Sequence, residues 1–450
     1  MRTIQASDSN SPRTKYDHAP RKTPWLPPIL LLLVQVLFLL APAQGSAQGQ
    51  DHALPNQPSK PVQEEIKLGM TAGFSGPIRE ISVDLYHGAM ACFQRINRQG
   101  GVHGRNISLV VLDDAYTPGP AMANVVHLVE EDRVLCLFNC VGSPTLTRVL
   151  PLLTHYSQEH VLLLFPFSGA EPLYASIHSG SIYLFRPSYD RELRDVIDRL
   201  LQAGRTRISV LYQADAFGRS GWQSVKTALK ERGLAMVSDG AYARGATFES
   251  SFLSQVETVL AGKPDAVVNV ATAGSASGFI RDLRRSGSCL PVVSISSVNA
   301  QEQYRILSTL SARDDRDYLV GLVNSQTVPF FNDPDLAAAI EYRAAMAEET
   351  VGPPPFLATQ DYTPHDMSPT GFEGFLAAKL MATILEKLGP EVSRATLTSR
   401  IADLGPLDIG LARPVHFTTM NRIALHDIHY IAFDADGLIP IDDWNLGHCP

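Results

Sequence analysis

The chain has 450 residues, of which 45% are hydrophobic, and its formal net charge is -8. This length and apolar content allow a large hydrophobic core and more than one domain. The acidic balance and the lack of a basic tract argue against nucleic-acid binding, and five cysteines are too few for a disulfide-dense scaffold.

The first 47 residues show the order of charged, apolar and small residues that is typical of a secretory signal. Basic residues precede an apolar run at 29–40, and small residues follow at 41–47. The leading segment is long, so an uncleaved anchor is the alternative, although the apolar run is short for a membrane-spanning helix. The sequence predicts a signal peptide at 1–47, a linker at 48–63 and an exported, soluble product.

From residue 64 onward, short apolar runs alternate with segments of helical periodicity, which is typical of parallel strands joined by crossover helices. We expect strands or extended stretches at 66–70, 107–112, 134–138, 161–165, 182–185, 208–212, 235–237, 266–270, 291–295 and 318–324. We expect helices at 85–96, 121–130, 146–156, 190–203, 219–232, 252–260, 279–285, 335–349 and 371–388. A hairpin at 414–441, with its turn at 434–437, ends this series. The pattern predicts an α/β fold with two lobes, between which the chain crosses more than once.

The stretch 134–173 contains the strand–loop–helix unit twice, and its small polar loops follow the strands. Open α/β sheets bind ligands in such loops. Ser143 followed by Pro144 is typical of a helix N-cap with proline at the first helical position. Backbone N–H groups there favour an anion such as a carboxylate, and Ser143, Thr145 and Ser168 add hydroxyls. The alternative is that these residues only cap helices and fill turns.

Signatures of catalysis and of metal binding are scarce. The sequence contains no G-x-G-x-x-G, G-x-x-x-x-G-K-[ST], G-x-S-x-G or H-E-x-x-H motif. His416, His426 and His429 lack a cysteine or a well-spaced carboxylate, so surface histidines explain them better than a metal site. Asp113 and Asp114 point to opposite faces of a strand, which favours loop capping over a shared proton. We expect no catalytic residue, metal or cofactor.

The cysteines also argue against a disulfide framework. Cys92 lies on an apolar helix face and is expected to be buried and free. Cys136 and Cys140 would lie too far apart to form a bridge if they belong to one strand and its end. A bridge between Cys289 and Cys449 is conceivable, but nothing in the sequence supports it.

An ordered set of segments resembles one family. The segments are GFSGP at 73–77, GA at 88–89, INRQGGVHGR at 96–105, DD at 113–114, VGSPT at 141–145, FRP at 185–187, FG at 217–218, PDAVV at 264–268 and IRDLR at 280–284. Together they resemble type I periplasmic binding proteins of the leucine/isoleucine/valine-binding class, over residues 64–440. These proteins are the extracytoplasmic receptors of ABC importers, so the resemblance implies a periplasmic monomer that serves a permease in the inner membrane.

The resemblance implies two Rossmann-like lobes, three hinge strands and a ligand in the cleft between the lobes. The N-lobe would comprise 64–186 plus 325–408, and the C-lobe would comprise 187–320 plus 415–450. The hinges would lie near 186–190, 319–324 and 408–415. The ligand would bind one lobe, the other would close over it, and the importer would recognise the closed form.

The resemblance also implies where the ligand binds. The family holds an amino acid's carboxylate with N–H groups and hydroxyls of N-lobe loops, here at 143–145 and 168–169, and often places an aromatic ring over the ligand, here Phe217. The candidate ligand-binding residues are Ser75, Gly142, Ser143, Thr145, Phe167, Ser168, Gly169, Tyr189, Phe217, Thr272 and Ser296.

The sequence departs from the family at the end of the strand at 291–295. Amino-acid binders carry an acidic residue there that pairs with the ligand's ammonium, whereas this chain reads SISS at 294–297. A buried ammonium without a countercharge is costly, which favours a deaminated carboxylate, an amide or a urea-like molecule. Glu80 or Asp190 are alternative sources of the charge. The alternative function is a sensing module of the same fold that presents its ligand to a membrane receptor. An enzyme is a weaker alternative, because the sequence lacks a nucleophile–base signature.

Overall fold

The computed structural model describes residues 65–175, 180–442 and 444. The expected signal peptide at 1–47 and the linker at 48–63 lie outside these residues. Within the described part of the chain, no helix combines the length and the apolar character that crossing a membrane requires.

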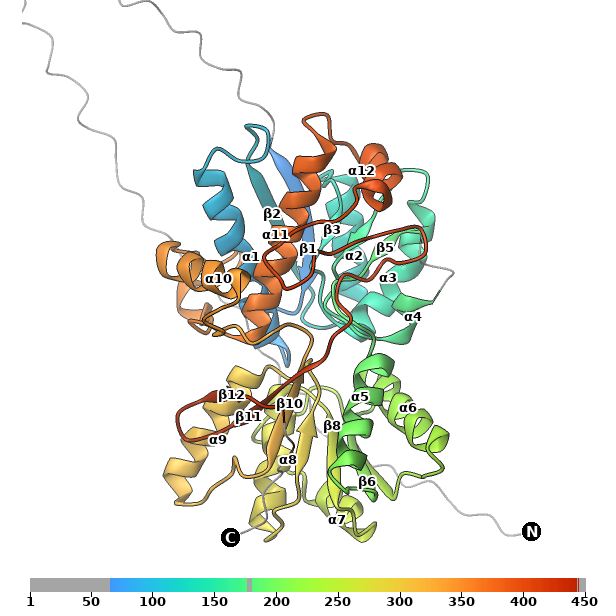
Figure 1. Ribbon diagram of the computed structural model, residues 1–450, viewed down its shortest axis with the longest axis vertical. Coiled ribbons are helices and arrows are strands. Elements are labelled where there is room, and N and C mark those ends of the chain that lie inside the picture. The colour runs from blue at the N-terminus through green and yellow to red at the C-terminus, as the bar shows by residue number, and fades with distance from the viewer. Residues whose placement is uncertain (1–64, 176–179, 443, 445–450) are drawn as a thin grey trace, which may run out of the picture. The chain divides into compact units, whose positions relative to one another are not determined.

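The first sheet is parallel and has the strand order β2-β1-β3-β4-β5 (Figure 1). Its strands are β1 (Ile66–Ala72), β2 (Ile107–Asp113), β3 (Leu137–Phe138), β4 (Leu163–Leu164) and β5 (Ile182–Tyr183). The helices that alternate with them are α1 (Arg79–Arg98), α2 (Pro118–Glu130), α3 (Ser143–His155) and α4 (Glu171–Tyr174). In such doubly wound sheets the strand order reverses at a switch point, here between β1 and β3, and ligands bind outside the carboxyl ends of the strands at that point.

The second sheet repeats this plan, with the order β12-β11-β10-β9-β8-β6-β7. Its strands are β6 (Ile208–Gln213), β7 (Ser238–Tyr242), β8 (Ala266–Val270), β9 (Val292–Ser294), β10 (Leu322–Gln326), β11 (His429–Phe433) and β12 (Leu438–Pro440). Its helices are α5 (Tyr189–Gln202), α6 (Ala216–Glu231), α7 (Leu253–Ala261), α8 (Ala273–Arg285) and α9 (Ala300–Asp314). The strands from β7 to β10 are parallel, so the second switch point lies between β6 and β8. The expected C-terminal hairpin is confirmed as the antiparallel pair β11–β12.

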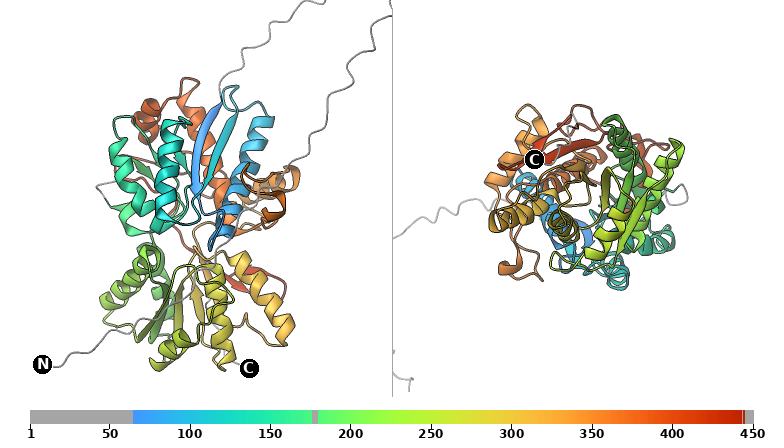
Figure 2. Two further views of the ribbon diagram at one scale, coloured as in Figure 1. Left: turned by 180° about the vertical axis from the view of Figure 1, so that it is seen from behind. Right: turned by 90° about the horizontal axis from the view of Figure 1, so that it is seen from below.

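Helices cover both faces of the first sheet, with α1 and α11 on one face and α2 and α3 on the other (Figure 2). The later helical elements are α10 (Ala337–Glu348), η2 (Thr359–Asp361), α11 (Pro369–Leu388), α12 (Arg394–Arg400) and η3 (Ile401–Asp403). The backbones of α1 and α11 approach so closely that a Cβ atom on Gly88 would lie 1.8 Å from the Gly371 carbonyl oxygen. Glycine at position 88 therefore permits this packing.

The chain passes between the two sheets near 185–189, 326–328 and 425–429. Val328 packs in the core of the first sheet, directly after β10 of the second sheet. The second crossing thus lies at 326–328, and not at 319–324 where we expected the hinge. Val415 and Phe417 are also buried in the core of the first sheet, and the Ala424 N–H donates to the Leu184 carbonyl. The segment 415–425, which we expected in the C-lobe, therefore packs on the first sheet, and the third crossing follows it.

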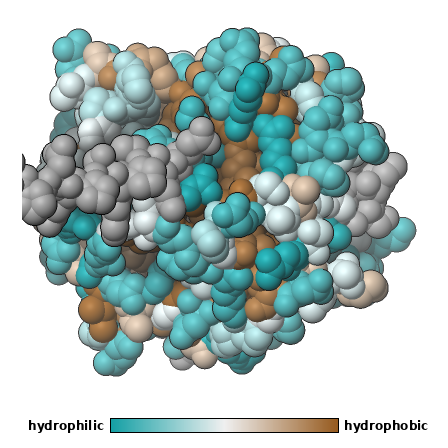
Figure 3. Space-filling model, turned by 90° about the horizontal axis from the view of Figure 1, so that it is seen from above, coloured by the Kyte–Doolittle hydropathy of each residue, from teal (hydrophilic) through white to brown (hydrophobic). Residues whose placement is uncertain are grey.

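We define the N-lobe as the first sheet with residues 65–185 and 327–425, and the C-lobe as the second sheet with residues 186–326 and 426–442. Seen from above, the N-lobe shows mostly hydrophilic side chains, with hydrophobic ones visible in the hollows between them (Figure 3). One expected strand was wrong: residues 235–237 precede β7, which begins at Ser238 and pairs only with β6. The apolar run therefore did not mark the strand at this edge of the sheet.

Candidate functional site

The loops at the two switch points line one cavity of about 20 Å³ between the lobes. The N-lobe contributes Ile78, Ile81, Tyr116, Val141, Gly142, Ser143 and Phe167, and the C-lobe contributes Tyr189, Phe217, Thr272 and Ser297. Six of the eleven candidate residues thus come together: Gly142, Ser143, Phe167, Tyr189, Phe217 and Thr272. The cavity therefore lies where the carboxyl ends of the parallel strands of both sheets face each other.

The walls of this cavity are apolar or carry hydroxyl groups, and no residue that lines it bears a formal charge. Burial raises the pKa of the Tyr116 phenol well above its ordinary value, and burial likewise raises the pKa of Tyr189. Both phenols are therefore neutral donors at physiological pH. A ligand group in this cavity would meet apolar contacts and neutral hydrogen-bonding groups.

Ser143 is the first residue of α3 and not its N-cap, contrary to the prediction. The N-cap is Gly142, which has a φ of 112°, a conformation that favours glycine. Ser143 therefore enters the helix, and its Oγ hydrogen-bonds to Ser168 Oγ at 2.8 Å and to the Tyr189 hydroxyl at 3.2 Å. Pro144 has no N–H, so the first turn of α3 offers the N–H groups of Ser143 and Thr145 without intrahelical acceptors.

Thr145, Ser168 and Gly169 lie behind the cavity and position the residues that line it. Thr145 Oγ1 lies within hydrogen-bonding distance of the carbonyls of Val141 and Gly142, at 2.9 and 2.8 Å, so its hydroxyl holds the turn. The Gly169 carbonyl accepts from the Tyr189 N–H at 2.7 Å, and a Cβ atom on Gly169 would lie 2.5 Å from the Tyr189 ring. Ser168 is fully buried. These contacts give the three residues a supporting role.

Ser75 lies outside the cavity, on an exposed turn. Its Oγ donates to Asp113 Oδ2 at 2.6 Å, and Asp113 Oδ1 accepts from the Ser75 N–H. Asp114 points elsewhere: it accepts from Thr71 Oγ1 at 2.9 Å and from the Tyr116 N–H at 2.8 Å. Both carboxyl groups cap the following turn, as predicted, because Asp113 also accepts from the Ala115 N–H, and Asp114 helps to place Tyr116 at the cavity.

A buried guanidinium that no sequence pattern predicted lies at the first crossing. Arg186 is 1% exposed, and its Nη2 donates to Ser296 Oγ and Thr327 Oγ1 at 3.0 Å and to Glu373 Oε2 at 3.2 Å. The guanidinium carbon lies 4.0 Å from the centroid of the Phe167 ring. Ser296 thus serves this network and does not line the cavity.

A second carboxylate completes the network. Glu192 of α5 is fully buried and accepts from the Ser296 N–H at 2.7 Å and from Ser325 Oγ at 2.6 Å. Burial raises the pKa of Glu373, while Arg186 opposes this shift. We name Arg186, Glu192, Glu373, Ser296 and Thr327 the hinge network, because its members come from both lobes and from the second crossing.

A second polar contact joins the lobes through His365, in the loop before α11. Its Nδ1 lies 2.8 Å from Asp84 Oδ2 in α1, and its Nε2 lies 3.3 Å from Glu302 Oε2 in α9. Burial lowers the pKa of His365, but Asp84 and Glu302 outweigh this effect and raise it to about 10. The imidazolium therefore bridges a carboxylate of each lobe, and Asn299 Nδ2 adds a hydrogen bond to Asp84 at 2.8 Å.

The other histidines and the cysteines show no site of this kind. His416, His426 and His429 line a separate cavity of about 360 Å³, but within the described residues no group of three side chains is arranged to hold a metal. Cys92, Cys136 and Cys140 are buried and free, and burial raises the pKa of each thiol. The conceivable Cys289–Cys449 bridge involves residue 449, which lies outside the described residues.

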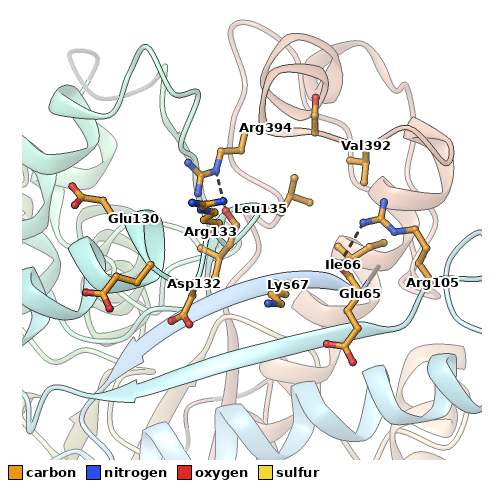
Figure 4. Close-up of a pocket in the computed structure, with 13 residues that line it drawn as sticks. Glu65, Ile66, Lys67, Arg105, Glu130, Asp132, Arg133, Leu135, Val392 and Arg394 are labelled. Carbon is orange, nitrogen blue, oxygen red and sulfur yellow. Dashed lines mark hydrogen bonds between the residues drawn. The ribbon is translucent and has the colours of Figure 1, made fainter. Parts of the chain in front are cut away.

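Another cavity, of about 860 Å³, lies at the opposite end of the first sheet (Figure 4). It borders the start of β1 at Ile66 and Lys67 and carries charges of both signs, among them Arg133 and Arg394. Arg394 Nε donates to the Val134 carbonyl at 2.9 Å. Because open α/β sheets bind ligands at their carboxyl ends, the small cavity between the switch points is the better candidate site.

Comparison with known proteins gives the family. Residues 65–437 match the family model described as periplasmic binding protein. The chain belongs to this family, and the expected two-lobed α/β fold of the type I class is confirmed. A solved structure of a possible leucine/isoleucine/valine-binding protein from Rhodopirellula baltica is 26% identical, with a TM-score of 0.72, covering 85% of this chain and 97% of that one.

The curated relatives are similar over shorter stretches. A Leu/Ile/Val-binding protein homolog from Brucella melitensis is 24% identical over 237 residues, 50% of this chain and 57% of that protein. The chain therefore spans little more than half the length of this relative. A branched-chain amino acid ABC transporter protein from Thermus thermophilus, solved with bound valine, has a TM-score of 0.70 at 15% identity, which shows the fold alone.

Proposed function

We propose that the chain is an exported solute-binding protein of an ABC importer, which captures a small polar or carboxylated ligand, an amino acid or a similar compound, in the cleft between its lobes. The observation that carries this proposal is a cavity that the switch-point loops of both sheets line together. Such a site binds and releases its ligand without turnover, and it needs no catalytic group.

Hinge closure follows from the placement of the contacts. Ser143 comes from one lobe, and Phe217 and Thr272 come from the other, so the ligand would gain its full set of contacts only when the lobes approach each other. Arg186 lies at the hinge and has hydrogen-bond partners in both lobes. Movement of one lobe toward the other can therefore be coupled to the packing around Arg186. The importer permease would then recognise the closed form.

The test is a thermal-shift screen of the chain from residue 48. Leucine, isoleucine and valine are tested first, because the names of relatives refer to these amino acids. Phenylalanine, the deaminated acids, short amides and urea complete the panel. A ligand at about 100 times its Kd should add roughly 2.7 kcal/mol to the free energy of unfolding. Stabilisation by at least one compound, with one ligand per monomer by calorimetry, is expected. No stabilisation by any compound would contradict the proposal.

A matched pair of serine variants locates the site. Ser143→Ala removes a hydroxyl at the cavity wall and should weaken binding of the ligand by about fivefold, since a hydrogen bond contributes about 1 kcal/mol. Ser75→Ala removes an exposed hydroxyl that bonds to Asp113, and the affinity should stay within about twofold of the wild type. Equal losses in both variants, measured by titration calorimetry, would argue against this cavity.

A further inference from the structure

A second cavity between the lobes adjoins the first and shares Thr272 with it. Its volume is about 360 Å³, and its lining comes from the turn before α1 and from Glu80 of α1, and on the C-lobe side from the loop at 246–249, from Gly274 and from α9. Its charged groups are the carboxyls of Glu80, Glu249 and Glu302 and the guanidinium of Arg305. The larger cavity is therefore acidic, whereas the smaller one bears no charge.

The charged groups of the larger cavity differ in how they are paired. Arg305 donates from Nε and Nη2 to the Glu302 carboxylate, at 2.7 and 2.6 Å, so these two charges offset each other. Glu249 Oε2 accepts from Thr247 Oγ1 at 2.7 Å in an exposed position. The Oε1 atom of Glu80 is buried, and no donor among the described residues reaches it.

The surroundings of Glu80 explain its chemistry. Burial, together with the charges of Glu302 and Asp84, raises the pKa of Glu80 to about 8, against the opposing effects of a hydrogen bond to its own backbone and of the charge on His365. Asp84 itself is fully engaged, because it accepts hydrogen bonds from Asn299, His365 and Ser368. Glu80 is thus the carboxyl group of this cavity that has an open position for a donor.

We propose that the ligand of the cleft carries a basic amine, and that its ammonium binds to Glu80 while the rest of the ligand lies in the larger cavity and reaches toward Thr272, where that cavity meets the uncharged one. This inference rests on the proposed function and assigns the ligand class. An ammonium supplies both the missing donors and the countercharge that would hold the Glu80 carboxylate ionised in a buried site. Glu80 would replace the acidic residue that the sequence lacks at 294–297, so the absence of that residue does not exclude an amino acid.

Titration calorimetry with three matched probes tests this assignment. Leucine has both groups, isopentylamine lacks the carboxylate and isocaproate lacks the amine. Glu80→Gln preserves the shape of the side chain and should weaken the two amine probes by about tenfold or more, while leaving isocaproate unchanged. Glu257→Gln removes an exposed carboxyl of α7 that lines neither cavity, and should change each affinity by less than about twofold.

Proton release gives a second readout. Near pH 7 the Glu80 carboxyl is mostly protonated, so binding of an ammonium should release close to one proton per ligand to the buffer, and the Glu80→Gln variant should release none. The groups that face Glu80 and must be held constant are Asp84, Glu302, Arg305 and His365. Thermal unfolding at pH 6, where Glu80 is protonated, should show the variant folded like the wild type.

The outcomes separate this inference from the proposed function. If isocaproate binds and the amine probes bind no better to the wild type than to the Glu80→Gln variant, the chain is still a binding protein, but Glu80 does not recognise an amine. If no compound of the whole panel stabilises the chain, the proposed function fails, and this inference fails with it. A tenfold loss confined to amine probes supports both.

Discussion

Arg186→Met is expected to lower the free energy of unfolding by about 3 to 5 kcal/mol, because it leaves the buried Glu373 carboxyl without its guanidinium and removes the nearby positive charge that Glu192 also faces. Glu192 is fully buried and Glu373 is 5% exposed, so solvent cannot replace the lost partner. The change also removes the hydrogen bonds to Ser296 and Thr327, one on each side of the hinge. Urea denaturation followed by circular dichroism measures the loss.

Two controls distinguish a buried ion pair from general damage. Arg313→Met breaks a surface pair between Arg313 and Asp314, in which the arginine side chain is 64% exposed, and should leave the free energy of unfolding nearly unchanged. The double variant of Arg186→Met and Glu373→Met removes both partners and should recover much of the loss, since hydrophobic residues often replace a buried pair at little cost. An Arg186→Met variant as stable as Arg313→Met would contradict the importance of the hinge network.

Apolar runs in the sequence located most of the strands, because strands that are covered on both faces are apolar along their whole length. β8, for example, is fully buried over Ala266–Val270 and was predicted at the same residues. β7 fails this test: Ser238–Tyr242 is partly exposed and pairs only with β6 at the sheet edge. Hydrogen bonds to β6 fix the position of β7, and apolar side chains do not. The apolar pattern therefore placed the strand a few residues too early.

The candidate site was predicted in part for a similar reason. Residues that directly follow parallel strands must gather at one edge of a sheet, which brought Gly142, Ser143 and Thr272 to the cavity. Tyr116 was missed because a turn with positive φ at positions 115 and 116 directs its side chain, and no periodic pattern reports such a turn.

Long-range partners were beyond the reach of the sequence altogether. Arg186 and Glu373 are 187 positions apart, and Asp84 and His365 are 281 apart. Each is a single charged residue that no periodic pattern pairs with its partner, and a pairing at this separation depends on how the two lobes pack. The contacts that join the lobes are therefore visible only in the folded structure.

The contribution of His365 to stability is expected to fall as the pH rises from about 6.5 to about 10. Its pKa is raised from its ordinary value near 6.5 to about 10 in the folded chain, so the folded state binds the proton more tightly than the unfolded state. A raised pKa stabilises the fold fully below the unfolded value, and this stabilisation is lost as the pH passes through the folded value. At pH 6, His365→Gln should cost on the order of 3 kcal/mol, and at pH 10 much less.

The measurement is the difference in the free energy of unfolding between wild type and variant at several pH values. In this difference, the contributions of groups that titrate alike in both proteins cancel. The charges that face His365 are Asp84 and Glu80 of α1 and Glu302 of α9. His127→Gln is the matched control: its side chain is 44% exposed beside Glu131, so the cost should stay below about 1 kcal/mol. A difference for His365→Gln that stays constant or grows with pH would show that the bridge between Asp84 and Glu302 does not hold in solution, and that the lobes must be joined by the hinge network alone.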